Sequence, residues 1–119
     1  PTPAVPTLLF TGTTDCIAPP SAAVAAFEAA AAAGVPAGLV NKVDADHHEP
    51  ASLYPATPYS CVKTPFNPQL GLYTVAWAKL WQRTPRSLGV DWEGLLYGSL
   101  NSSLCGGGDG ALAACNVTR

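Results

Sequence analysis

Two short stretches of the sequence concentrate side chains that could do chemistry. Asp15 follows one predicted strand, and the run Asp-Ala-Asp-His-His-Glu at residues 44–49 follows the next. An acid and a histidine held together supply two members of a nucleophile–histidine–acid triad. In such a triad the carboxylate selects the imidazole tautomer and stabilises the imidazolium that forms. The sequence therefore predicts an acid–base pair.

Each of these groups also has a plain structural interpretation. An aspartate such as Asp15 is a common turn or helix-cap residue, and His47 and His48 are alternatively inert, hydrogen-bonded loop residues. Residues 44–49 offer nitrogen and oxygen ligands for zinc, but neighbours on one loop rarely converge on one tetrahedral ion. We therefore expect no metal and no cofactor, and we interpret Glu49 as a solvated loop charge.

The cysteines indicate the compartment in which the protein folds. They are Cys16, Cys61, Cys105 and Cys115. None lies in a Cys-x-x-Cys spacing, and four widely spaced cysteines fit two disulfides in an oxidising compartment. Three connectivities are possible, and four buried thiols are the alternative. N-glycosylation acceptor triplets at Asn101 and Asn116 agree with secretion. The sequence predicts a secreted glycoprotein or one in the lumen of the secretory pathway.

The elements that must position the acid and the histidines follow from hydrophobic patterning. Residues 6–11 form a continuous apolar run, typical of a strand buried on both faces in a parallel sheet. Ser21 is the predicted N-cap of an alanine-rich helix that runs to about Ala33, with Gly34 just past its end. Residues 37–43 are the next predicted strand, at the spacing of a right-handed crossover. Because carboxyl ends of parallel strands share one rim, Asp15 and the histidines are expected there together.

The rest of the chain is a long loop, a helix and a C-terminal segment. Residues 44–67 are predicted loop, whose aromatic residues either line an apolar acyl or aryl pocket or pack the loop itself; they are Tyr54, Tyr59 and Phe66. Asn67 and Pro68 form an N-cap and first-turn pair for a helix over residues 69–83. The apolar face of that helix is expected in the core, and it comprises Tyr73, Ala76, Trp77, Leu80 and Trp81.

The C-terminal segment has a weaker pattern. Residues 95–104 fit neither helix nor strand alone, and three glycines at residues 106–108 form a turn. Because Cys105 and Cys115 flank this turn, we expect a small terminal disulfide loop.

Composition excludes several function classes. The 119 residues are 48% hydrophobic and 12% charged, with a net charge of -2, whereas average domains carry about 25% charged residues. This balance excludes a disordered acidic tail and leaves no basic footprint for nucleic acid or an anionic membrane. No apolar run approaches the ~20 residues of a membrane span. The chain contains no methionine, which predicts a processed product or a fragment.

Three segments together resemble the α/β-hydrolase superfamily, in particular its dienelactone-hydrolase and cutinase-like polyester-hydrolase branch. Residues 6–20, PTLLFTGTTDCIAPP, are similar to the strand and loop that carry the family's acid, here Asp15. Residues 44–50, DADHHEP, are similar to the family's Gly-Ala-Ser/Asp-His segment, which places the base at His47. Residues 72–80, LYTVAWAKL, resemble the family's last long helix. The resemblance covers about residues 3–83, in the family's own order of acid, histidine and final helix.

The resemblance implies that the chain is the C-terminal portion of a single α/β-hydrolase domain. Residues 1–83 would be the acid- and histidine-bearing core, and residues 84–119 an extension with the disulfide loop. The family's Gly-x-Ser-x-Gly nucleophile elbow does not occur in the sequence. The serine, the oxyanion donor and most of the sheet would then belong to a preceding N-terminal portion, the expected partner. In some secreted members a disulfide ties the acid loop to the histidine loop, which implies a bridge between Cys16 and Cys61.

The function implied by the resemblance is that of a secreted serine hydrolase acting on carboxylic esters. Its serine would attack the carbonyl, His47 would transfer the proton, and Asp15 would orient His47. The substrate would be a small-molecule or polymeric ester, and this chain alone should be inactive. The alternative is a non-catalytic hydrolase-fold glycoprotein with a structural or interaction role. A decayed site has no physical need for both Asp15 and His47, so their presence favours the enzyme.

Overall fold

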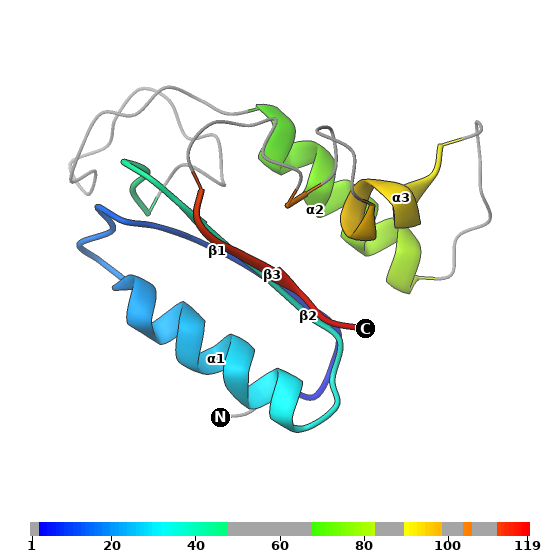
Figure 1. Ribbon diagram of the computed structural model, residues 1–119, viewed down its shortest axis with the longest axis horizontal. Helices are drawn as coiled ribbons and strands as arrows, with labels where there is room; N and C mark the ends of the chain where they lie inside the picture. The colour runs from blue at the N-terminus through cyan, green and yellow to red at the C-terminus, as the bar shows by residue number, and fades with distance from the viewer. Residues whose placement is uncertain (1–2, 48–67, 83–89, 99–103, 106–111) are drawn as a thin grey trace.

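The chain folds into a small mixed α/β structure. The computed structural model describes residues 3–47, 68–82, 90–98, 104–105 and 112–119. The elements are β1 (Thr7–Gly12), α1 (Pro20–Ala32), β2 (Ala37–Lys42), α2 (Pro68–Trp81), α3 (Trp92–Tyr97) and β3 (Leu112–Val117). Helix α1 lies on one face of the sheet, and α2 and α3 lie on the other (Figure 1). The predicted α/β class is confirmed at this level.

The sheet has three strands in the order β1-β2-β3. Strands β1 and β2 are parallel, with Thr7 opposite Ala37 and Gly12 opposite Lys42, and α1 is the crossover between them. The predicted strand–helix–strand unit is therefore confirmed. Strand β3 pairs antiparallel with the other edge of β2, with Gly38 opposite Val117. The sequence pattern did not indicate β3, because a six-residue stretch without clear alternation becomes a strand only through its partner.

Helix α1 begins and ends by two different devices. It begins at Pro20, with Pro19 as its N-cap and no side-chain cap, so the prediction of Ser21 as N-cap is wrong. Proline at the first helical position already has a helical φ and has no N–H to satisfy. At the other end Gly34 has a φ of 68°. The N–H groups of Gly34 and Val35 donate to earlier carbonyls at 3.0 Å each, which is a Schellman closure. The predicted glycine stop is confirmed.

The main core lies between the sheet and the layer of α2 and α3. Its buried members are Val40, Tyr73, Ala76, Trp77, Leu96 and Leu104. The predicted apolar face of α2 is confirmed for Tyr73, Ala76 and Trp77, while Leu80 is partly buried at the core margin. Asp91 is the N-cap of helix α3, and its carboxylate accepts the N–H of Gly94 at 3.0 Å. This capped turn brings Leu96 into the core.

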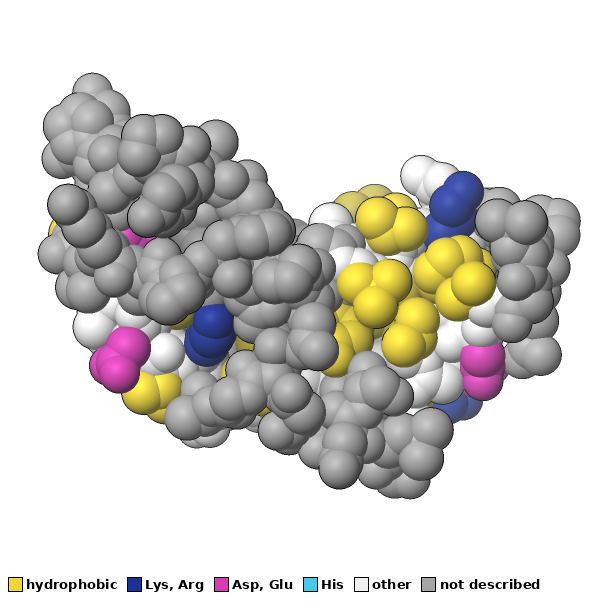
Figure 2. Space-filling model, turned by 90° about the horizontal axis from the view of Figure 1, so that it is seen from above, with side chains coloured by type: hydrophobic (Ala, Val, Ile, Leu, Met, Phe, Trp, Pro, Cys, Tyr) yellow, Lys and Arg dark blue, Asp and Glu magenta, His cyan; other side chains and the backbone are white. Residues whose placement is uncertain are grey.

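Helix α2 is apolar on its outward side as well. Leu72, Val75 and Trp81 are 44%, 48% and 36% exposed. Figure 2 shows hydrophobic side chains gathered on the face seen from above, where α2 lies in Figure 1. A surface helix normally turns a polar face to water, and α2 departs from that pattern at these positions. Among the helices that the structure describes, none has the length and apolar character needed to cross a membrane.

Candidate functional site

Asp15 is held by its own loop at the carboxyl end of β1. Its N–H donates to the carbonyl of Gly12 at 3.0 Å, which closes a turn directly after the strand. Its Oδ1 accepts the N–H groups of Ile17 at 2.9 Å and Ala18 at 2.8 Å. The side chain is only 4% exposed. Oδ1 therefore fixes the orientation of the carboxylate through these two hydrogen bonds, which leaves Oδ2 available for a different partner.

The environment of Asp15 favours its charged form. Burial raises the pKa of the carboxyl group, but the N–H groups of Ala18 and Ile17 and the contact with His47 outweigh burial. The pKa of Asp15 therefore lies below its ordinary value of 3.8. Hydrogen bonds to an ionised carboxylate stabilise the charge. At neutral pH the side chain is thus an acceptor only.

His47 meets the second oxygen of this carboxylate. Its Nδ1 lies 3.0 Å from Oδ2 of Asp15, although the two residues are 32 positions apart in the chain. Because the ionised carboxylate can only accept, Nδ1 carries the proton, and the neutral ring has its lone pair on Nε2. The His47 side chain is 42% exposed. This is the arrangement of a general base whose tautomer is set by an acid.

The two loops of this pair approach each other closely. A Cβ built on Gly12 would overlap the carbonyl of Ala45, so only glycine permits this approach at the end of β1. The rim expected at the carboxyl ends of β1 and β2 thus carries both Asp15 and His47. The structure brings together the two residues predicted as acid and base, and their catalytic role stays a prediction.

The other predicted residues of the histidine loop are placed differently. Asp44 is exposed, with a φ of 59°, whereas Asp46 is buried at 3% exposure. Within the described ranges, no group of three or more His, Cys, Asp or Glu side chains is arranged to hold a metal ion. The remaining predicted residues lie outside the described residues; they are His48, Glu49, Tyr54, Tyr59, Phe66 and Asn101.

The structure confirms one of the predicted disulfides. Cys105 and Cys115 are bonded, with their Cα atoms 5.5 Å apart. Cys16 also belongs to a disulfide, but Cys61 lies outside the described residues, so their pairing stays a prediction. Asn116, one of the two predicted glycosylation acceptors, is exposed on β3.

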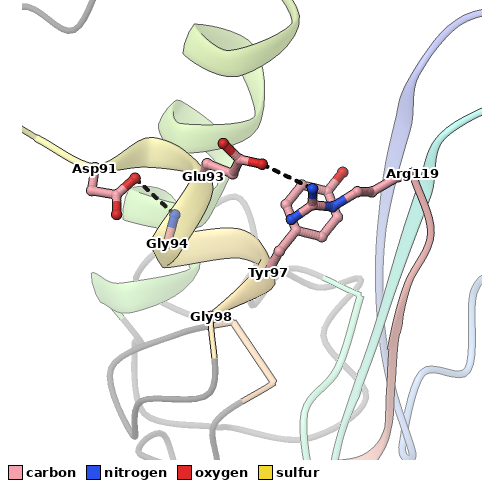
Figure 3. Close-up of a pocket in the computed structure, with 6 residues that line it drawn as sticks. All are labelled: Asp91, Glu93, Gly94, Tyr97, Gly98 and Arg119. Atoms are coloured by element: carbon pink, nitrogen blue, oxygen red, sulfur yellow. Dashed lines mark hydrogen bonds and ion pairs between the residues drawn. The ribbon is translucent and has the colours of Figure 1, made fainter.

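A pocket lies at the end of the sheet opposite to Asp15 and His47. It is a shallow pocket of about 230 Å³, shown in Figure 3 and lined by Asp91, Glu93, Gly94, Tyr97, Gly98 and Arg119. Nη1 of Arg119 lies 3.0 Å from Oε1 of Glu93, and its guanidinium carbon is 4.6 Å from the centre of the Tyr97 ring. No sequence motif indicated these residues, five of which lie within residues 91–98 while Arg119 comes from the C-terminal end of the chain.

The charges around this pocket are largely matched among themselves. Burial raises the pKa of Tyr97, and Glu93 adds to the rise while Arg119 opposes it, so the pKa lies above its ordinary value of 10.0. The phenol therefore stays neutral at physiological pH. Its hydroxyl donates to the carbonyl of Thr118 at 3.3 Å. Arg119 and Glu93 are both well exposed. Such a set stabilises the packing of α3 beside β3 and offers no acid–base pair.

Comparison of the chain with protein-family models, with curated proteins and with solved structures finds no match. A functional hypothesis therefore depends on the chemistry of Asp15 and His47 and on the resemblance of their segments to a hydrolase.

Proposed function

We propose that this chain supplies the acid and the base of a secreted serine hydrolase that acts on carboxylic esters. The observation that carries the proposal is the contact of 3.0 Å between Nδ1 of His47 and Oδ2 of Asp15, at the carboxyl ends of two parallel strands. In the α/β-hydrolase arrangement that the resemblance implies, the nucleophilic serine lies outside this chain.

The proposed chemistry uses each atom of the pair in turn. Nε2 of His47 takes the proton of the serine hydroxyl as its oxygen attacks the ester carbonyl. The imidazolium that forms is stabilised by the charge of Asp15. His47 then returns the proton to the departing alkoxide, which leaves as an alcohol. Water repeats the two steps on the acyl-enzyme and restores the serine, so no proton or electron is left unaccounted for.

Two surface features support a larger domain around this chain. In the part of the chain that the structure describes, β1 is an edge strand with no charged side chain. Unprotected edges of this kind are usually covered or paired. The outward side of α2 is apolar, with Leu72 and Val75 about half exposed. A preceding portion of the same hydrolase that pairs with β1 would continue the sheet.

Secretion is part of the same proposal. The bond between Cys105 and Cys115 fits an oxidising compartment, and the exposed Asn116 is open to glycosylation. Intact mass measured before and after glycosidase treatment, on material from a secreting eukaryotic host, tests this part. An unchanged mass would contradict glycosylation at Asn116.

The central experiment is labelling of the intact hydrolase with a fluorophosphonate, together with hydrolysis of a p-nitrophenyl ester. We expect one serine to be labelled, and we expect His47→Ala to lower ester hydrolysis by about 10³-fold or more. The matched control is His48→Ala, which removes the adjacent histidine and should retain activity. Absence of labelling would overturn the proposed function. Loss of activity in His48→Ala but not in His47→Ala would show that the base is assigned to the wrong residue.

A further inference from the structure

Besides the contact between Asp15 and His47, four hydrogen bonds join the turn after β1 to the end of β2 and to the start of the loop that carries His47. The N–H of Thr13 donates to the carbonyl of Lys42 at 2.9 Å, and Oγ1 of Thr13 accepts the N–H of Asp44 at 2.9 Å. The carbonyl of Ala45 accepts both the N–H of Thr14 at 3.1 Å and its hydroxyl at 2.7 Å. We call Thr13 and Thr14 the threonine clamp.

The clamp lies next to both members of the acid–base pair. Thr14 directly precedes Asp15, and Ala45 lies two residues before His47. The His47 side chain is 42% exposed, and the backbone of its loop fixes where its ring can reach the carboxylate of Asp15. The carboxylate of Asp15 is oriented separately by the N–H groups of Ile17 and Ala18. The backbone of the histidine loop is therefore one determinant of where His47 lies relative to that carboxylate, and the clamp acts on this backbone.

The Ala45 carbonyl is the acceptor through which Thr14 acts. The shorter of its two bonds comes from the Thr14 hydroxyl, a side chain that a point substitution can remove without changing the backbone. Gly12 allows this carbonyl to approach β1, since any side chain at that position would overlap it. The close approach of the Ala45 carbonyl to Gly12 and the hydrogen bond from the Thr14 hydroxyl together hold the start of the histidine loop against the end of β1.

We propose that Thr14 is a positioning residue for the acid–base pair. Its hydroxyl holds Ala45, and through Ala45 it keeps Nδ1 of His47 on Oδ2 of Asp15. The catalytic consequence rests on the proposed function, whereas the effect on His47 itself does not. Acid–base pairs require placement within about 0.5 Å, and the Thr14 hydroxyl bonds the loop only two residues before His47.

The test is the tautomer of His47 in the 119-residue chain. Long-range ¹H–¹⁵N correlation NMR at pH 8 distinguishes a ring protonated at Nδ1 from one protonated at Nε2. We expect the Nδ1–H form to dominate in the unaltered chain and to become the minor form in Thr14→Val, which keeps the shape but removes the hydroxyl. Thr14→Ser restores the hydroxyl and should restore the Nδ1–H form. A structural role alone would not select a tautomer.

The matched control is Thr7→Val, at the other end of β1. The hydroxyl of Thr7 also donates to a backbone carbonyl, that of Val5, at 2.7 Å, but it lies far along the strand from His47. We expect Thr7→Val to leave the tautomer unchanged. An unchanged tautomer in Thr14→Val, or an equal change in Thr7→Val, would overturn the proposal.

Hydrogen exchange keeps the proposal testable even if Thr14→Val does not fold. In the unaltered chain the N–H groups of Thr14 and Asp44 should exchange at least ~10-fold more slowly than open amides. Exchange of both at the unprotected rate would overturn the clamp.

Activity of the intact hydrolase separates the two proposals. We expect Thr14→Val to lower kcat by about 10- to 100-fold with little change in KM, as for a small misplacement of a catalytic group. A tautomer change without fluorophosphonate labelling of the unaltered protein would support the clamp and overturn the proposed function. Fluorophosphonate labelling of the unaltered protein without a tautomer change in Thr14→Val would support the proposed function and overturn the clamp.

Discussion

The carboxylate of Asp15 divides its two oxygens between local and long-range partners. Oδ1 is satisfied by the N–H groups of Ile17 and Ala18, two and three residues ahead in the chain. Oδ2 is left for His47, which arrives from 32 residues away. A side chain oriented before its partner arrives is preorganised, so little conformational entropy is lost when the pair forms. At the scale of single residues the site is built around this division.

The charge of Asp15 predicts a pH dependence of stability. Because the folded-state pKa lies below 3.8, the ionised side chain stabilises the fold above the unfolded pKa. This contribution is lost as pH falls through the folded pKa. We expect Asp15→Asn to lower the free energy of unfolding by about 1–3 kcal/mol at pH 7. The difference from the unaltered chain should shrink steadily below about pH 4.

Urea unfolding of both chains at several pH values between 7 and 3 measures this difference. A gap that is equally large at pH 3 and pH 7 would show that the charge of Asp15 does not cause it.

Among the elements, β3 has the least support from its own sequence. It pairs with β2 over Gly38 to Lys42, and the register shifts between Asn41 and Lys42. The disulfide between Cys105 and Cys115, which are ten positions apart in the chain, reinforces its attachment. The hydroxyl of Thr118 accepts the N–H of Ala37 at 3.0 Å, just beyond the end of the strand. The strand is therefore secured from within, at Cys115, and just past its C-terminal end, at Thr118, by contacts other than its backbone hydrogen bonds to β2.

Removal of this disulfide should weaken β3 before the rest of the sheet. We expect the double substitution Cys105→Ser and Cys115→Ser to lower the free energy of unfolding by about 2–3 kcal/mol, mainly because the unfolded chain is less restricted. Urea unfolding measures the total effect, and amide exchange at Asn116 on β3 compared with Leu9 on β1 measures its location. Equal loss of protection at both residues would contradict the special dependence of β3 on the bond.

At the scale of the whole molecule, one core joins the sheet to the layer of α2 and α3. Trp77 is 7% exposed within that core. Trp81 lies one turn further along α2 and is 36% exposed, with its ring centre 5.8 Å from that of Trp77. One tryptophan side chain is thus inside the core, and a second one lies at the edge of the core. This makes the two tryptophans a matched pair for testing which contacts hold the layers together.

We expect Trp77→Ala to lower the free energy of unfolding by about 3–5 kcal/mol, the cost of a large cavity in a core. Trp81→Ala should cost about 0.5–1.5 kcal/mol, since mainly the ring pair is lost. A domain of this size has only about 5–15 kcal/mol in total, so Trp77→Ala should also broaden or lose the cooperative transition. Circular dichroism during urea titration measures both. Similar losses of unfolding free energy in the two variants would show that Trp77 is not the main contact between the sheet and the helices.

Local pattern was sufficient for much of this fold and for the acid–base pair. An unbroken apolar run, a crossover of fitting length and a glycine at the end of α1 predicted β1, α1 and β2. Parallel strands then placed Asp15 and His47 on one rim, because their carboxyl ends necessarily share an edge. Helical spacing placed Tyr73 and Trp77 in the core. Each of these inferences depends on residues within a few positions of one another, or on strand direction alone.

Tertiary structure decided the features that depend on distances between remote segments. Strand β3 forms because its backbone pairs with the free edge of β2. The start of α1 at Pro20, and not at Ser21, depends on the conformation of the loop that precedes the helix. Two contacts depend on how closely the loops after β1 and β2 approach each other. One joins Oδ2 of Asp15 to Nδ1 of His47, 32 residues apart, and the other joins the Thr14 hydroxyl to the Ala45 carbonyl, 31 residues apart. No periodicity encodes such an approach, because it results from the packing of β1 against β2. The sequence by itself thus determined which side chains reach the rim, and only the folded chain determined which of their atoms touch.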